Sequence, residues 1–61
     1  MSQFFVTDEF SAIRARDAVV AGEPITISGT GQDGFGVFIG VVESVEEISP
    51  QKWQITIRDG K

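Results

Sequence analysis

Acidic side chains form the most chemically suggestive cluster in this sequence. Glu43, Glu46 and Glu47 follow one another closely, and Asp33 stands in a glycine-rich turn before them. Paired carboxylates can transfer protons or bind calcium. The spacing of these acids does not fit a calcium-binding loop, and solvated acids at the end of a strand explain the cluster more simply.

The sequence offers little else for catalysis. It contains no histidine and no cysteine, so the usual general base near neutral pH and the thiolate nucleophile are both missing. No lysine or carboxylate stands at a spacing that would activate a serine or threonine. We therefore predict a protein that is not an enzyme and binds no metal and no cofactor. The alternative, an enzyme or small-ligand site, requires a pocket lined by Asp33, Glu43 and Trp53.

Four glycines gather in one turn region, at positions 29, 31, 34 and 36. A phosphate-binding loop would need a helix start behind the glycines and often a lysine. Here a β-type run follows, no lysine is present, and Asp33 would repel a phosphate. Asp33 followed by Gly34 is instead typical of a tight hairpin turn that requires a positive φ.

Length and charge limit the classes of function. The chain has 61 residues, which suits one domain over residues 1–61. Its net charge of −4 disfavours binding to nucleic acid or to an anionic membrane through bulk electrostatics. Residues 1–6 do not resemble a signal peptide, and no apolar stretch approaches the roughly 20 residues of a membrane helix. We expect a soluble, cytoplasmic, acidic protein.

The small size of the chain predicts a partner. A domain this short buries only about 60% of the surface of its unfolded chain, so its core is marginal. Small domains gain stability from disulfides, metals or partner subunits. Since the sequence lacks cysteine and histidine, a partner subunit is the remaining source, and we expect a homo-oligomer or a complex with a protein partner.

One helix is predicted at about residues 8–20. Thr7 or Asp8 can cap it, because a short side-chain oxygen accepts hydrogen bonds from the free amides of the first turn. Gly22 is a favourable C-terminal stop, and Pro24 prevents continuation of the helix.

Strands make up the rest of the predicted fold. They are expected at residues 3–6, 24–28, 35–45 and 52–58, and residues 4–6 are a candidate for closing the sheet. In the last strand Trp53, Ile55 and Ile57 alternate with polar residues, which indicates that one face is buried. Consecutive hairpins imply antiparallel pairing. The expected fold is mainly β with one N-terminal helix (α+β), forming a small, strongly bent antiparallel sheet or a partly open barrel.

The two faces of the strand at residues 35–45 are predicted from simple alternation. One face, assigned to the core, carries four residues: Val37, Ile39, Val41 and Val45. The other face carries Phe38 and Val42, and Gly40 between them suggests a bend or bulge. The helix, residues 4–6 or a partner subunit must cover Phe38 and Val42.

The strand at residues 52–58 is predicted to be an unpaired edge strand if no further strand follows it. Exposed edges recruit other strands unless they are protected. We therefore expect a non-enzymatic, self-associating interaction module that acts as an adaptor or regulatory protein. Its predicted interface consists of Phe38, Val42, Lys52, Gln54, Thr56 and Arg58.

The order of elements resembles the Sm and Sm-like small β-barrels. Residues 25–28, Gly34 and residues 40–46 are similar to the first Sm motif, which is a strand, a turn glycine and a bent strand ending in an acid. The second Sm motif is not found. The resemblance implies a bent sheet and rings or dimers formed through edge strands.

The same resemblance supplies an alternative function, a nucleic-acid-associated Sm-like barrel. Its candidate contacts to nucleic acid are Arg14, Arg16 and Lys52. The loop by which the family reads RNA is replaced here by acidic and apolar residues at positions 46–49. No RNA-contacting residue of the family is therefore carried over.

Overall fold

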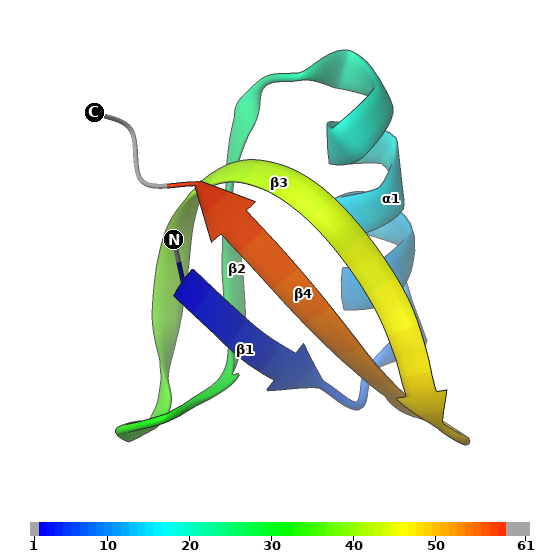
Figure 1. The fold of residues 1–61 in the computed structure, drawn as a ribbon, viewed down its shortest axis with the longest axis vertical. Helices are drawn as coiled ribbons and strands as arrows, with labels where there is room; N and C mark the ends of the chain where they lie inside the picture. The colour runs from blue at the N-terminus through cyan, green and yellow to red at the C-terminus, as the bar shows by residue number, and fades with distance from the viewer. Residues whose placement is uncertain (1, 59–61) are drawn as a thin grey trace.

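The computed structural model describes residues 2–58 and shows a mainly β fold with one helix (Figure 1). In chain order the elements are β1 (Ser2–Val6), α1 (Glu9–Ala21), β2 (Pro24–Gly31), β3 (Gly34–Ser49) and β4 (Lys52–Arg58). The predicted fold class is confirmed, and β2 and β3 are longer than predicted. α1 is too short to cross a membrane, and the described residues contain no other helix.

The four strands are antiparallel to their neighbours and follow one another around a ring. β4 lies between β1 and β3, and β3 pairs with β2. β1 returns to β2 at one position, where Phe5 is paired with Thr30. Because this seam consists of one register pair, the molecule has a ring-like bent sheet and not a barrel closed along its length.

α1 begins and ends at the predicted capping residues. The Asp8 side chain accepts a hydrogen bond from Phe10 N at 3.4 Å, which satisfies a free amide of the first turn. Gly22 has φ 70°, and its N–H donates to a carbonyl oxygen of the last turn at 2.8 Å. Three small residues of α1 are buried: Ala12, Ala15 and Ala18. They let the helix pack closely on β2 and β3.

The hydrophobic core lies between α1 and the inner side of the sheet. Its buried side chains are Phe4, Val6, Ala12, Ala15, Ala18, Ile27, Val42, Trp53, Ile55 and Ile57. Ile25, Phe38 and Val45 are partly buried and pack against this core. The alternation predicted for β4 is confirmed, because every second residue from Trp53 onward is buried.

The inward face of β3 is the opposite of the predicted one. Val37 and Ile39 are 62% and 65% exposed, whereas Val42 is 3% exposed. The register against β4 shifts between Val42 and Ser44, so β3 accommodates one extra residue there. This bulge places Val42 and Val45 on the same inner side of the strand. Strict alternation, continued through the bulge, therefore assigned the first half of β3 to the wrong face.

Gly40 marks the point where β3 changes its partner strand. Residues before it pair with β2, and β4 joins from Val41 onward. A Cβ atom at position 40 would lie 2.7 Å from the backbone oxygen of Arg58, so a side chain there would displace the end of β4. The glycine permits a close approach of two strands, and the predicted bulge lies further along β3.

β4 is a central strand and not the predicted edge. Residues 2–6 of β1 pair with residues 53–57 along one side of β4, and β3 pairs with its other side. The prediction of an edge is wrong because β1 closes the sheet there. This pairing joins segments that are far apart in the sequence. The alternation of apolar and polar residues within one strand does not indicate which distant strand pairs with it.

Candidate protein-interaction face

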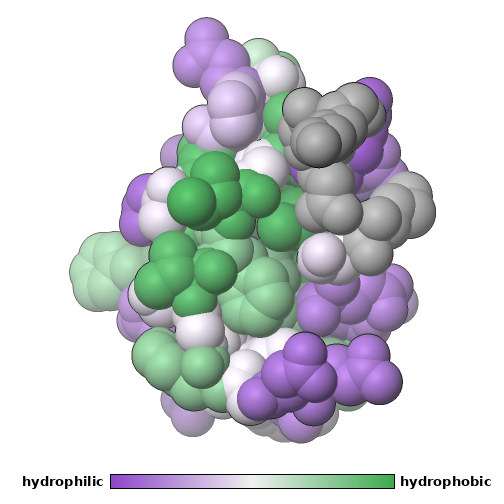
Figure 2. All heavy atoms as spheres, turned by 90° about the vertical axis from the view of Figure 1, so that its left-hand side faces the viewer, coloured by the Kyte–Doolittle hydropathy of each residue, from purple (hydrophilic) through white to green (hydrophobic). Residues whose placement is uncertain are grey.

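Three successive outward positions of β3 carry large apolar side chains. Phe35, Val37 and Ile39, named here the apolar stripe, are 77%, 62% and 65% exposed. Gly36 and Phe38 occupy the inward positions between them. Figure 2 shows the resulting apolar patch on the side of the molecule that the β2–β3 hairpin forms. Large contiguous apolar patches on a surface are typical of interaction sites, so the apolar stripe is a candidate for one.

The surface beside the apolar stripe is uncharged. On β2 the stripe is paired with Thr30, Ser28 and Thr26, which are all exposed. The whole chain carries five basic and nine acidic residues, so β2 and residues 34–41 of β3, which have no charged side chain, form a distinct region. A partner that covers only these outward side chains removes no ionised group from water, and Arg14, whose Nη2 donates to Thr26 O at 3.2 Å, lies at the border of the region.

One edge of β3 is unpaired beside the stripe. Residues 34–41 pair with β2, while the pairing with β4 starts only at Val41. Within residues 2–58, no strand lies against the second edge of residues 34–40. Sheets usually protect such an edge with charges, prolines or bulges. Residues 34–40 contain neither a charge nor a proline, so this segment is open to an added strand.

A groove of about 940 Å³ opens next to this segment. Residues 31–38 line it together with four residues of β1 and β4: Ser2, Gln3, Phe5 and Thr56. The Phe38 ring lines the groove and stacks on the buried Phe4 ring, with centroids 4.2 Å apart. The start of β3 is therefore accessible from the groove.

The chain itself covers the two apolar residues of the predicted interface. Val42 is 3% exposed and belongs to the core. Phe38 is half-buried, because its ring packs on Phe4. Phe38 and Val42 are therefore covered by the chain itself, through β1 and the core, and not by a partner subunit. Val42 offers no surface to a partner, and Phe38 offers only the part of its ring that lines the groove.

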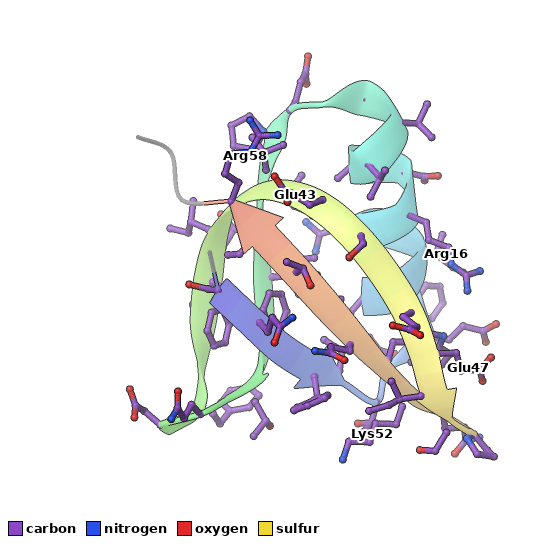
Figure 3. The ribbon with its side chains drawn as sticks, viewed as in Figure 1. Arg16, Glu43, Glu47, Lys52 and Arg58 are labelled. Carbon is purple, nitrogen blue, oxygen red and sulfur yellow. The ribbon has the colours of Figure 1, made fainter. Side chains whose placement is uncertain are left out.

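The polar residues of the predicted interface make contacts within the sheet. Thr56 Oγ1 accepts a hydrogen bond from Gln3 Nε2 at 3.4 Å. Arg58 Nε lies 2.7 Å from Glu43 Oε2, and both side chains project from the same end of the sheet in Figure 3. Gln54 is paired on both sides, with β1 and with β3. These residues therefore belong to a strand whose two edges are already paired.

The three cations considered as nucleic-acid contacts do not converge. Arg14 Nη2 donates a hydrogen bond to Thr26 O at 3.2 Å. Lys52 Nζ lies 4.8 Å from the centroid of the Phe5 ring, in a cation–π contact. Arg16 is exposed on α1 and points away from the sheet, whereas Lys52 lies at the start of β4 (Figure 3). These side chains do not form one basic patch.

The residues of the alternative ligand pocket are also separated. Asp33 lines the groove, whereas Trp53 lines a different hollow near the start of α1. Glu43 is paired with Arg58. Among residues 2–58, no three acidic side chains are grouped so that they could hold a metal ion.

α1 also exposes apolar side chains, but charges interrupt them. Phe10 and Val20 are 76% and 89% exposed near the two ends of the helix. Arg14 and Asp17 are exposed between them. Scattered apolar residues of this kind are usual on protein surfaces, so the apolar stripe remains the stronger candidate.

The sequence contains one signal for the observed orientation of β3. Glu43 shares the alternation of Val37 and Ile39, and a charge in that phase fits an outer face better than a core. The opposite phase contains Gly40, and a glycine suits a position where two strands approach closely. Interpretation of the strand by its apolar content alone missed the stripe.

No protein-family model matches the chain, and no curated protein or solved structure matches it significantly. The apolar stripe, the unpaired edge and the groove are therefore the features on which a function is inferred.

Proposed function

We propose that this chain is a small, self-associating, non-enzymatic interaction module that acts as an adaptor or regulatory protein. The observation that carries the proposal is the apolar stripe beside an unpaired strand edge. Burial of apolar surface contributes about 25 cal/mol per Å². The free backbone groups of an edge also gain hydrogen bonds from an added strand. Both effects favour a partner at the first half of β3.

The composition of the core supports the same proposal. Three of the buried residues are alanines, and the largest fully buried side chains are Phe4 and Ile55. A core with so few large side chains contributes little free energy of unfolding. Association through the apolar stripe would add buried apolar area without any change in the fold.

Substitution of Val37 by lysine tests the proposal. We expect the native chain to form dimers or larger oligomers as its concentration rises, and Val37→Lys to remain monomeric, because association would bury an ionised group. Sedimentation velocity over a range of concentrations measures both. Val20→Lys is the matched control, since it replaces an exposed valine of α1, and it should associate like the native chain.

A native chain that stays monomeric at every concentration would overturn the proposal. Equal loss of association in both lysine variants would also count against it, because the effect would then follow from charge alone. Near-ultraviolet spectra of the buried Trp53 confirm that each variant is folded.

The second candidate is a nucleic-acid-associated Sm-like barrel. The packing of a helix on a small, ring-like bent sheet supports it, whereas the net charge of −4 and the dispersed cations count against it. Titration with mixed-sequence RNA at low salt separates the two candidates. Binding that weakens steeply towards physiological salt would favour the barrel function, and lack of binding at low salt would eliminate it.

A further inference from the structure

The unpaired segment of β3 carries a large apolar outward side chain two residues before Val37 and another two residues after it. Residues 35–39 have the sequence Phe-Gly-Val-Phe-Ile. If two copies pair antiparallel about Val37, the two Val37 residues face each other and Phe35 of each copy faces Ile39 of the other. Large outward side chains then meet along the whole stripe, and such cross-strand pairs stabilise antiparallel sheets.

The inward positions of the same segment are also compatible with this register. Gly36 would face Phe38 of the second copy. A Cβ atom at Gly36 would have no other atom within 4 Å, so there is open space beside the strand at that point. The pairing therefore places a bulky residue opposite the one inward position that has no side chain.

The distribution of charge favours a second copy as the occupant. A two-fold contact places the same surface of both copies together, so a surface without charged side chains meets another surface without them. Two copies with a net charge of −4 each repel one another. They can approach best through a surface without charges, and the outward residues of β2 and of residues 35–39 provide one. A strongly basic partner would instead be attracted to Glu46 and Glu47.

We propose that the partner at the apolar stripe is a second copy of this chain, bound by antiparallel pairing of the two unpaired β3 edges about a two-fold axis at Val37. The proposal rests on the self-association proposed above and specifies its contact. The paired segment is about 17 Å long. The groove beside residues 34–38 gives the second strand access to this edge.

Single cysteines test the register, because the native chain contains none. Opposed Cα atoms in an antiparallel pair are about 4.5–5.5 Å apart, which is within the range for a disulfide. Val37→Cys should therefore form a disulfide-linked dimer under a mild oxidant. In the same register the two copies of position 39 are about 14 Å apart, so Ile39→Cys alone should not be linked.

A mixture of two variants checks the register with Val37 intact. Phe35→Cys mixed with Ile39→Cys should give the mixed disulfide dimer. Val20→Cys on α1 is the control for random collision, and we expect linkage of Val37→Cys to be at least tenfold faster. Electrophoresis without reductant measures all four reactions, and the Trp53 spectrum checks folding.

The outcomes separate this proposal from the function on which it rests. A native chain that remains monomeric overturns both. A native chain that associates, while Val37→Cys and the mixture are linked no faster than Val20→Cys, overturns the register and leaves self-association standing. Rapid linkage of Ile39→Cys alone would likewise show a different register.

Discussion

The two halves of β3 differ in whether their unpaired edge carries features that prevent the addition of another strand. Residues 34–40 pair only with β2, and residues 42–49 pair only with β4, so within residues 2–58 each half has one edge without a strand. The second half carries Glu43, Glu46 and Glu47 and two register shifts, which are features that prevent strand addition. The first half carries none of these features. One strand thus shows both a protected edge and an edge open to a partner.

The junction between the two halves is the most sensitive position. We expect Gly40→Val to lower the free energy of unfolding by about 3 kcal/mol, because the new Cβ would collide with the backbone oxygen of Arg58. Gly36→Val is the control, since a Cβ there meets nothing within 4 Å, and its effect should be below about 0.5 kcal/mol. Urea unfolding at low protein concentration measures both. Equal losses would contradict the close approach of β4 at Gly40.

A pair of valines tests which face of β3 is buried in each half. Val42→Ala should cost about 2 kcal/mol of unfolding free energy, because it removes buried methyl groups and leaves a cavity. Val37→Ala should cost less than about 0.5 kcal/mol in the monomer, because its side chain is exposed. Thermal or urea unfolding of the two variants measures both losses of unfolding free energy. A larger loss for Val37→Ala than for Val42→Ala would mean that the face carrying Val37 is buried, as strict alternation predicts.

The ion pair of the second half should have the smallest effect. Glu43→Gln removes the partner of Arg58, whose side chain is 65% exposed, so the loss of unfolding free energy should be below about 0.5 kcal/mol. The loss should shrink further in high salt. Sedimentation of this variant should match that of the native chain. Altered association would mean that the second half also takes part in the contact.

Local patterns in the sequence predicted the helix and the strands but not how the strands close into a ring. The caps at Asp8 and Gly22, the turn at Gly34 and the alternation from Trp53 onward are short-range signals, and the structure confirms each of them. The sequence made residues 4–6 a candidate for closing the sheet but did not identify residues 53–57 as their partners, because that pairing depends on packing between the two ends of the described chain.

The candidate site was predicted less well than the fold. A bulge adds one residue to a strand and inverts the alternation beyond it. Because the bulge lies between Val42 and Ser44, alternation continued through it grouped Val45 with Val37 and Ile39 and placed all three in the core. The kind of function proposed is unchanged, but its proposed location moved from Val42 and β4 to the first half of β3.

Amide hydrogen exchange across β3, followed as a function of protein concentration, tests most directly whether its first half is the contact surface. Amides of residues 34–40 that point to the unpaired edge should gain protection as the concentration rises, because they become hydrogen-bonded to a second strand. Amides on the unpaired edge of residues 42–49 should show no such change. Constant exchange of residues 34–40 from the lowest to the highest concentration, or an equal gain in both halves, would contradict this assignment.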